Sequence, residues 1–528
     1  MIFRGPYTDV EIPEVALTPL VLRQAERLPD KPALIEGLSG RVLTYGELAR
    51  HIRRAAASLS QRGLVKGDVF AIYSFNYPEF AVAFHAVALL GGINTPVNTL
   101  YTAEEVARQL KDSGAKFLLT VPQLLDKALE AARASGVQEV FVIGEAEGAT
   151  GFNALLEGLG EPPLVQINPR EDMVALPYSS GTTGLPKGVM LTHRNLVANI
   201  RQMEGLCYFS EDDTLVCVLP LFHIYGLVVI LNMGLYMGAT IVTLPRFELE
   251  QFLQTLETYS VTLAHLVPPV LLALAKQPVV DRYDLSQLKT IFCGAAPLGE
   301  DLSRACMERL GCHLRQGYGM TETSPVTHST PADPAQFKHG SVGTLAPNTE
   351  CKIVDPSSGA ALGTHQEGEI CVRGPQIMKG YLNRPDATAE TIDEEGWLHT
   401  GDIGYADEEG HFFIVDRVKE LIKYKGFQVA PAELEALLLS HPSVADAAVI
   451  PYADEEAGEV PKAFVVLKPG LEKTDATAEE LMAYVAARVA SHKKIRLLEF
   501  IEQIPKSLSG KILRRVLKER ERAKKKKE

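Results

Sequence analysis

The sequence predicts an α/β protein with a large N-terminal part built on parallel β-sheet and a smaller α+β C-terminal part. From about residue 15 to 170, β-type runs such as 69–74 and 116–121 alternate with helical patterns such as 45–62 and 103–112. Strands that alternate with helices favour a parallel sheet covered by helices on both faces. With 528 residues, 46% of them hydrophobic, the chain is long enough to divide into two or more domains.

The same alternation continues after residue 190, and the pattern then changes twice. A helix is expected over 192–206 and strands over 214–219 and 289–292. From 340 to 416 short strands with frequent turns predict a small β-barrel-like region. The C-terminal part predicts strands over 445–450 and 463–468 and helices over 432–439 and 478–489, the last opened by a capping box at Thr477.

Composition excludes several classes of protein. The formal net charge of -13 argues against non-specific nucleic-acid binding. The seven cysteines form no C-x-x-C pair, which suggests neither a disulfide framework nor a zinc site. Residues 1–6 do not open a signal peptide, so a cytoplasmic location is expected. The sequence does not indicate an oligomeric state.

The uncharged stretch 219–244 is long enough for a membrane helix. It is interrupted by Pro220, Gly226, Gly234 and Gly238, and it ends in β-branched residues. Because these residues break or end helices, the stretch predicts a buried helix followed by a buried strand, and no integral membrane segment.

A loop rich in glycine and hydroxyl side chains follows the apolar run 173–177. Its sequence, YSSGTTGLPKGV over 178–189, combines glycines that let backbone N–H groups approach an anion, hydroxyl donors and Lys187. The spacing differs from the common P-loop, since Leu185-Pro186 stands between Gly184 and the lysine. The loop therefore indicates a polyphosphate site such as one for ATP; the alternative is a flexible surface turn.

This loop closely resembles the signature of the acyl-adenylate-forming superfamily, which includes acyl-CoA synthetases, 4-coumarate–CoA ligase and firefly luciferase. Further segments resemble the same family: 220–226, 294–298, 316–322, 396–402, 415–426 and 505–511. The resemblance implies an N-terminal domain, 1–416, that holds ATP and acid in two parallel-sheet α/β subdomains plus a small β-barrel. It also implies a mobile C-terminal lid, 417–528, that pivots at Asp416.

Two carboxylates have chemistry that suits a nucleotide. Glu322 stands where the third glycine of a dinucleotide motif would be, and a glutamate facing a phosphate requires a cation, so it is a candidate Mg²⁺ ligand. Asp402 resembles the family's ribose ligand, and a carboxylate can accept hydrogen bonds from two hydroxyls at once. The alternatives are a solvated turn glutamate and an aspartate that caps its own turn.

The resemblance also implies roles for individual side chains. Tyr318 would pack on adenine, Thr321 would contact the α-phosphate, Arg417 would reach the ribose, and Lys511 would bridge the acid's carboxylate and the α-phosphate. The implied catalytic set is Lys511, Lys187, Thr183, Glu322, His223 and Lys423. The implied ATP set is Ser179, Ser180, Gly181, Thr182, Thr183, Gly184, Lys187, Gly294, Ala295, Ala296, Pro297, Gln316, Gly317, Tyr318, Gly319, Thr321, Asp402, Arg417 and Lys511.

The acid and CoA sites rest on the same resemblance. His223 is either a core histidine or, as the family implies, the gate of the acyl pocket. The implied pocket is apolar or aromatic apart from this gate: His223, Tyr225, Val228, Phe292, Gly294, Ala295, Gly317, Gly319, Pro325 and Val326. Some plant hydroxycinnamate ligases carry lysine at the position of Phe292, so aryl, arylalkanoic and medium- to long-chain fatty acids all remain open. The implied CoA set is Arg246, Lys423, Lys425, Gly426 and Gln428.

The expected function is that of an AMP-forming acid–CoA ligase, which uses ATP, Mg²⁺ and coenzyme A to activate a hydrophobic carboxylic acid and transfer its acyl group. Rival readings are an adenylate-forming enzyme whose second step does not use CoA, such as a luciferase-like oxygenase or an acyl-AMP ligase, and a non-catalytic nucleotide-binding protein.

Overall fold

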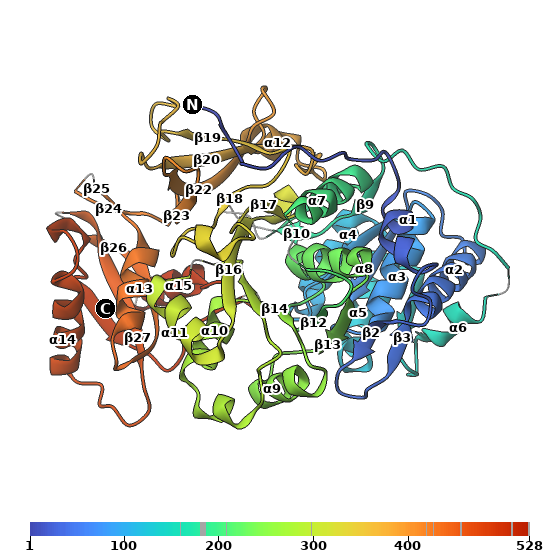
Figure 1. Ribbon diagram of the computed structural model, residues 1–528, viewed down its shortest axis with the longest axis horizontal. Coiled ribbons are helices and arrows are strands. Elements are labelled where there is room, and N and C mark those ends of the chain that lie inside the picture. Colours follow the sequence, from blue (N-terminus) through green and yellow to red (C-terminus); the bar gives the residue numbers. More distant parts are fainter. Residues whose placement is uncertain are drawn as a thin grey trace.

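The computed structural model describes residues 1–158, 160–179, 186–206, 209–296, 298–418, 420–425, 427–454, 457–507 and 510–525. Within these ranges the N-terminal part contains two nine-stranded sheets and one five-stranded sheet, and the C-terminal part has a five-stranded sheet of its own (Figure 1). This arrangement confirms the predicted fold class.

The first large sheet is parallel at its centre. Strands β4, β5, β6 and β7 pair in parallel, and the antiparallel strand β11 extends the sheet at the edge that carries the phosphate loop. In order the strands are β10 (Tyr178–Ser179), β11 (Lys187–Thr192), β9 (Met173–Ala175), β5 (Ile93–Pro96), β4 (Val69–Tyr73), β6 (Ala115–Thr120), β7 (Glu139–Val142) and β8 (Thr150–Gly151), and β21 (Gly380–Tyr381) pairs with β11.

The second large sheet is also parallel from β16 to β2, with antiparallel strands at both edges. Its order is β18 (Thr344–Leu345), β17 (Val326–Ser329), β16 (His313–Gly319), β15 (Thr290–Cys293), β14 (Leu263–Leu266), β12 (Thr214–Cys217), β13 (Thr240–Thr243), β2 (Pro32–Glu36) and β3 (Val42–Thr44).

The helices of the large domain begin where capping chemistry allows. Helices α2 and α4 start behind Thr44 and Thr102, each in a capping box with a glutamate three residues on. Thr192 ends β11 and caps α7, which fixes the angle between the phosphate-loop strand and its helix. These helices are α1 (Leu17–Val21), α2 (Tyr45–Gln61), α3 (Pro78–Leu89), α4 (Ala103–Ser113), α5 (Leu125–Ser135), α6 (Asn153–Leu156), α7 (His193–Gly205), α8 (Met233–Met237), α9 (Leu249–Thr258), α10 (Pro268–Lys276), α11 (Glu300–Leu310) and α12 (Pro385–Thr391).

The stretch 219–244 lies inside the large domain. It forms a π-helix, η3 (Tyr225–Asn232), then α8 and the fully buried strand β13, as predicted. None of the helices in the described ranges has the length and apolar character needed to cross a membrane. One apolar core joins both large sheets through α3, α7 and α8.

The β-rich region from residue 340 is an antiparallel sheet that also takes in the first strand of the chain. Its order is β1 (Phe3–Arg4), β19 (Glu350–Val354), β20 (Gly368–Arg373), β22 (Leu398–Ala406) and β23 (Phe412–Arg417). In the part of the chain that the structure describes, the edge strands β1 and β23 do not pair with each other, so the sheet is open. Asp402 and Arg417 face each other across β22 and β23.

The C-terminal part has its own apolar core around Leu434, Val449 and Val465. Its elements are β24 (Ile422–Tyr424), β25 (Phe427–Val429), α13 (Pro431–Ser440), β26 (Val444–Asp454), β27 (Gly458–Leu467), α14 (Asp475–Ala486), β28 (Leu497–Phe500) and α15 (Arg514–Lys525). The predicted cap at Thr477 was wrong: α14 begins at Asp475, because the Thr474 side chain accepts the hydrogen bond from the N–H of Thr477.

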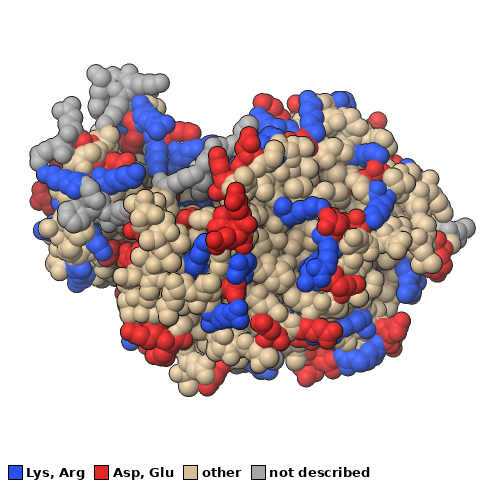
Figure 2. All heavy atoms as spheres, turned by 90° about the horizontal axis from the view of Figure 1, so that it is seen from above, with Lys and Arg blue, Asp and Glu red and all other residues tan. Residues whose placement is uncertain are grey.

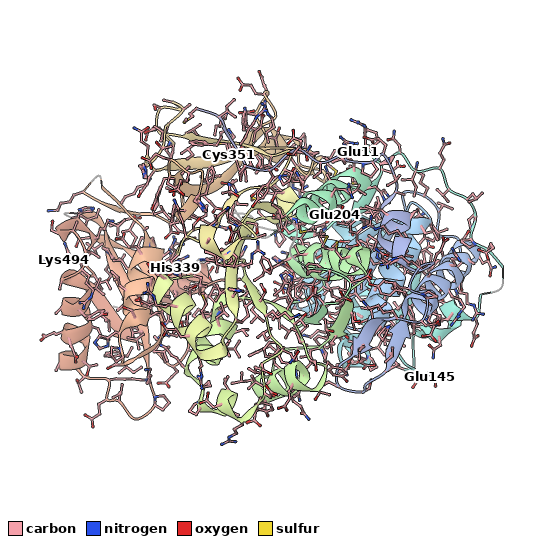
Figure 3. The ribbon with its side chains drawn as sticks, viewed as in Figure 1. Glu11, Glu145, Glu204, His339, Cys351 and Lys494 are labelled. Carbon is pink, nitrogen blue, oxygen red and sulfur yellow. The ribbon has the colours of Figure 1, made fainter. Side chains whose placement is uncertain are left out.

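The surface carries charges of both signs, and the described thiols form no disulfide. On the face in Figure 2, Lys and Arg are interspersed with Asp and Glu. The described cysteines are free and buried, and Figure 3 marks Cys351 in the β-rich region. The free, buried cysteines are Cys217, Cys293, Cys306, Cys312, Cys351 and Cys371.

Candidate active site

Glu322 lies at the junction of the two large sheets. It follows β16 and is 3% exposed. Its Oε1 accepts hydrogen bonds from the Ser179 hydroxyl at 2.7 Å and from the Tyr381 hydroxyl at 2.9 Å. Both partners are neutral donors, and together they use only part of the capacity of a carboxylate to accept hydrogen bonds. The arrangement suits a ligand of a hard cation such as Mg²⁺.

Lys187 is held beside this carboxylate by strand pairing. Strand β21 pairs with β11 so that Tyr381 lies opposite Val189, and the Leu382 N–H donates to the Gly188 carbonyl at 2.8 Å. The Lys187 Nζ then lies 4.8 Å from the centroid of the Tyr381 ring. Burial, together with the charge of Glu322, raises the pKa of the Tyr381 hydroxyl, which stays a neutral donor. Lys187 and Glu322 therefore contact the same tyrosine, the first over its ring and the second through its hydroxyl.

A second carboxylate, Asp402, accepts hydrogen bonds from two side chains. The Tyr318 hydroxyl donates to its Oδ2 at 2.7 Å, and Arg417 Nε donates to its Oδ1 at 3.0 Å. The Asp402 charge raises the pKa of Arg417, and burial raises the pKa of Tyr318. Asp402 is 5% exposed, so these bonds fix where its oxygens point.

Lys511 reaches this site from the C-terminal domain. A short hairpin holds it: the Lys511 N–H donates to Ser507 Oγ at 3.1 Å, and the Ser507 N–H donates to the Lys511 carbonyl at 2.9 Å. Gly510, at φ +77°, lies so close to Pro269 and Val267 that an added Cβ would be 3.0 Å from the proline Cδ. The hairpin is thus packed against the N-terminal domain.

The surroundings of Lys511 disfavour its charge. Burial, and next the positive charge of Arg417, lower its pKa to about 8, while the charges of Asp402 and Glu322 act in the opposite direction. Since Lys511 interacts with all three residues, the structure brings the predicted cations and carboxylates from both domains into one site.

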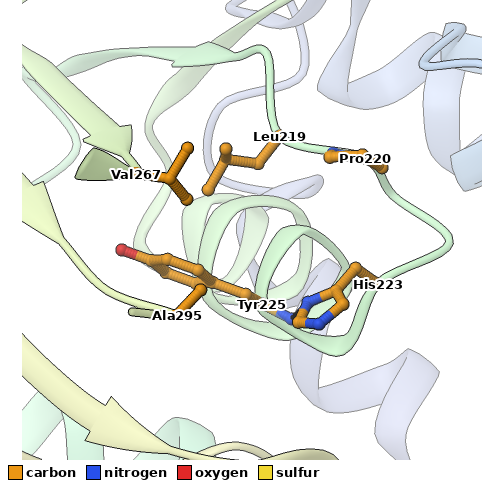
Figure 4. Close-up of a pocket in the computed structure, with 6 residues that line it drawn as sticks. All are labelled: Leu219, Pro220, His223, Tyr225, Val267 and Ala295. Carbon is orange, nitrogen blue, oxygen red and sulfur yellow. Dashed lines mark hydrogen bonds between the residues drawn. The ribbon is translucent and has the colours of Figure 1, made fainter. Parts of the chain in front are cut away.

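A small cavity adjoins the site (Figure 4). Its volume is about 10 Å³, and it is lined by Leu219, Pro220, His223, Tyr225, Val267 and Ala295. The His223 Nδ1 accepts a hydrogen bond from the Tyr225 N–H at 3.3 Å. Burial and the nearby Lys511 charge lower the pKa of His223 to about 3, which keeps the imidazole neutral.

Only part of the predicted acyl pocket lines this cavity. His223, Tyr225 and Ala295 do, and Gly294 lies under the Tyr225 ring, where an added Cβ would be 3.1 Å from Cε1. The other predicted positions do not line it: Val228, Phe292, Gly317, Gly319, Pro325 and Val326. Val228 is instead buried inside η3, and Phe292 lies behind a histidine, His265.

The predicted ATP-binding segments 294–298 and 316–322 have backbone geometry that requires small side chains at two positions. Ala295 adopts φ +71°, which larger residues rarely adopt. Gly319 lies so close to the Pro325 carbonyl that an added Cβ would be 1.8 Å from its oxygen, so only glycine fits. The Gln316 N–H donates to Thr330 Oγ1 at 2.9 Å, and Thr321 follows on η5 (Thr321–Thr323).

The structure describes the side chains of three of the predicted CoA residues. Arg246, Lys423 and Lys425 are exposed, and Figure 1 places β24 and β25 at the outer end of the C-terminal domain, away from β14 and β16. The predicted hinge, Asp416, is 6% exposed and accepts hydrogen bonds from the N–H groups of Arg417 and Ala432. Burial raises its pKa.

Some predicted residues lie outside the described part of the chain. They are Ser180, Gly181, Thr182, Thr183, Gly184, Pro297 and Gly426, together with the side chain of Gln428.

The sequence did not reveal several residues that shape the site. Tyr381 and Val267 lie on strands or turns that give no sign of which partner they meet. A further cluster stands just before Asp402: His399 Nδ1 is 2.9 Å from Glu369 Oε2 and 3.4 Å from Cys371 Sγ. These contacts, the thiol first, raise the pKa of His399 to about 10.

Comparison with known proteins agrees with this geometry. The family model described as AMP-binding enzyme matches residues 21–382, and the AMP-binding enzyme C-terminal domain matches residues 433–511. The chain belongs to this family of adenylate-forming enzymes.

Its similarity extends over the whole length of curated relatives. The chain is 46% identical to 4-coumarate–CoA ligase 1 of Petroselinum crispum, over 98% of this chain and 97% of the relative. It is 47% identical to 4-coumarate:CoA ligase 1 of Petunia hybrida, with the same coverage. Among solved structures, the anthranilate CoA ligase AuaEII in complex with anthranoyl-AMP superposes with a TM-score of 0.89 at 25% identity, over 97% of this chain and 98% of the other.

Proposed function

We propose that this enzyme activates an aryl acid as its acyl-adenylate at the site formed by Glu322, Asp402 and Lys511, and then transfers the acyl group to coenzyme A. The chain is an AMP-forming acid–thiol ligase that uses ATP, CoA and a small carboxylic acid. The observation that carries the proposed site is the position of Lys511, on a hairpin of the C-terminal domain, beside Arg417 and two carboxylates of the N-terminal part.

The first step removes two chemical obstacles. A carboxylate resists attack because a nucleophile must add charge to an anion, and oxide is a poor leaving group. A carboxylate oxygen therefore forms a bond to the α-phosphorus of ATP, the bond from that phosphorus to the bridging oxygen breaks, and pyrophosphate leaves. Charge neutralisation and alignment supply most of the catalysis.

The residues divide this work. Lys187 and the Ser179 hydroxyl hold the departing phosphates, and Lys511 neutralises the negative charge shared by the attacking carboxylate and the α-phosphate. Arg417 and Tyr318 orient Asp402 by hydrogen bonds, and Asp402 accepts further hydrogen bonds from the ribose hydroxyls. His223 is neutral, so it acts as a wall of the cavity and not as a proton donor.

Glu322 fits the role of Mg²⁺ ligand. It is a buried carboxylate bound only by neutral hydroxyls among the described residues, and hard cations prefer such oxygen donors. When bound, Mg²⁺ would offset the negative charge of the polyphosphate.

The second step needs a different arrangement. The CoA thiolate attacks the acyl carbonyl, the bond from that carbon to the AMP oxygen breaks, and AMP leaves. Lys511 occupies the site in this conformation, while Lys423 and Lys425 are exposed elsewhere. Rotation of residues 417–528 about Asp416 would withdraw Lys511 and present those lysines, and Arg246 would meet a CoA phosphate.

The acid is best matched by an aryl carboxylate without a charged tail. The cavity is lined by apolar and aromatic side chains and a neutral histidine, none of which would pair with a second charge. The curated relatives named above are 4-coumarate–CoA ligases, which supports a hydroxycinnamate or a similar aryl acid. A medium- to long-chain fatty acid is the alternative.

A panel of acids tests the proposal. The purified protein is incubated with MgATP and acetate, octanoate, palmitate, benzoate, cinnamate or 4-coumarate, with and without CoA, while pyrophosphate and thioester are measured. We expect thioester and AMP with the aryl acids and less with acetate. Preference for octanoate or palmitate would assign a fatty acid, and pyrophosphate without thioester would contradict transfer to CoA.

A further inference from the structure

A row of rings and one guanidinium runs behind the acyl cavity. His265, Phe292 and Arg315 lie opposite one another on the parallel strands β14, β15 and β16. In-register residues of parallel strands project from the same face, and here they stack. The ring centroids of His265 and Phe292 are 5.2 Å apart with a 17° interplanar angle, and the Arg315 guanidinium lies 4.9 Å from the Phe292 centroid.

This row ends on Tyr225, which forms one wall of the cavity. The Tyr225 hydroxyl lies 3.1 Å from His265 Nδ1, and the two rings meet edge to face at 5.5 Å. His265 is 2% exposed, and burial lowers its pKa to about 3, so the ring is neutral and the bond is insensitive to pH near neutrality. Within the described residues, His265 Nε2 has no hydrogen-bond partner, so the hydrogen bond of this ring is the one to the tyrosine hydroxyl.

Tyr225 is therefore fixed at three points. Its hydroxyl is held by His265, its backbone N–H donates to His223 Nδ1, and its ring lies against the backbone of Gly294. Figure 4 shows the ring extended between His223 and Ala295. The space that remains is about 10 Å³, room for about one water molecule. An aryl acid needs far more room, so the lining of the cavity must yield when the acid enters, and the Tyr225 ring is the largest side chain in that lining.

We propose that His265 is a specificity-determining positioning residue, which latches Tyr225 across the acyl pocket and so sets how easily a bulky acid displaces it. This inference rests on the proposed function, since it concerns the acid site of that reaction. A planar acid with few substituents displaces the ring least. An acid with large ring substituents must break the hydrogen bond between Tyr225 and His265, and it therefore binds more weakly.

The test compares cinnamate with trimethoxycinnamate in three variants. In His265→Leu and Tyr225→Phe the bond is absent, so we expect the ratio of kcat/KM for the bulky acid to that for cinnamate to rise by about 3- to 10-fold, as for one hydrogen bond. His265→Asn keeps a hydrogen-bonding atom near the place of Nδ1 and should restore the wild-type ratio. KM for ATP should not change in any of the three variants. A general structural defect would change it, so this measurement distinguishes the two explanations.

Tyr259→Phe is the matched control, because its hydroxyl also makes one hydrogen bond, to the Gly37 carbonyl at 3.2 Å, away from the cavity. A ratio that stays at the wild-type value in both His265→Leu and Tyr225→Phe would overturn the proposal. Thermal shifts with non-hydrolysable cinnamoyl and trimethoxycinnamoyl sulfamoyl-adenosines give the same ratio without turnover. Failure of the proposed function would instead appear as a wild-type enzyme that makes no thioester from any aryl acid.

Discussion

Two lysines approach the same site from two regions of the molecule that differ in how firmly they are held. Lys187 begins β11, a strand paired on both sides with β9 and β21, and its Nζ lies over Tyr381. Lys511 lies on a short hairpin that contacts the large domain through Gly510. A cation built into a sheet stays in place throughout the reaction, whereas one on a docked hairpin can be withdrawn.

The difference explains how one pocket could serve two half-reactions. Under the proposed function, the phosphates need a cation while ATP is bound, and the carbonyl must later be open to a thiol. Burial lowers the pKa of Lys511 to about 8, so holding its charge in this site carries a cost that undocking would relieve. The structure therefore favours separate tasks for the two lysines.

The largest expected effect comes from Lys511→Ala. We expect pyrophosphate release to fall by about 100- to 1000-fold, the range for loss of one group that stabilises transition-state charge. Thioester formation from a supplied acyl-adenylate should remain near the wild-type rate. Lys506→Ala is the control, since this lysine stands on the same hairpin but binds Asp446 at 2.7 Å. Equal loss of both half-reactions would show that Lys511 does not act in adenylation alone.

Asp402→Asn should have the next largest effect. It removes the charge that pairs with Arg417 while keeping the shape, and bonds to charged groups contribute about 1.5–3 kcal/mol. We expect KM for ATP to rise by about 10- to 100-fold, with much less change for ATP that lacks the ribose hydroxyls. Asp407→Asn, in the turn that follows β22 and bound to Lys338, provides the control. If both nucleotides lost affinity equally, Asp402 would not be a ribose ligand.

The pH profile of the first half-reaction tests the role of Lys511 without mutation. Adenylation needs Lys511 in its charged form, which predominates below a pKa of about 8 and is lost as the pH rises through it. Pyrophosphate release should therefore decline above about pH 8 and fall about fivefold between pH 8 and 9. Transfer from a supplied acyl-adenylate to CoA should not share this decline. A flat profile to pH 10 would argue that Lys511 is not needed as a cation.

Tyr381→Phe should have the smallest effect. It removes one of the two hydroxyls bound to Glu322 but keeps the ring beneath Lys187. We expect an increase of about 3- to 5-fold in the Mg²⁺ concentration needed for half-maximal rate, as for one neutral hydrogen bond. Tyr405→Phe, whose ring stacks on Phe413 away from the site, is the control. An unchanged Mg²⁺ requirement would separate Tyr381 from the cation site.

Local patterns predicted the elements, and resemblance predicted the site, but neither revealed how residues meet across strands. The alternation of apolar runs and turns was enough to place β4, α2 and β6, because these elements depend on local periodicity. The chemistry of Glu322 could be inferred from one segment. Its partner Tyr381 could not, since that contact depends on the pairing of β21 with β11. His265 was missed for the same reason: an isolated histidine in an apolar strand does not indicate which ring it holds.

A single-turnover experiment tests the central claim most directly. The enzyme is mixed with one equivalent of ATP and an aryl acid without CoA, and CoA is added later while acyl-AMP, pyrophosphate, AMP and thioester are followed. The account predicts that acyl-AMP and pyrophosphate form first and that CoA then converts the adenylate to thioester and AMP. Thioester that forms without a preceding adenylate, or an adenylate that CoA cannot discharge, would contradict it.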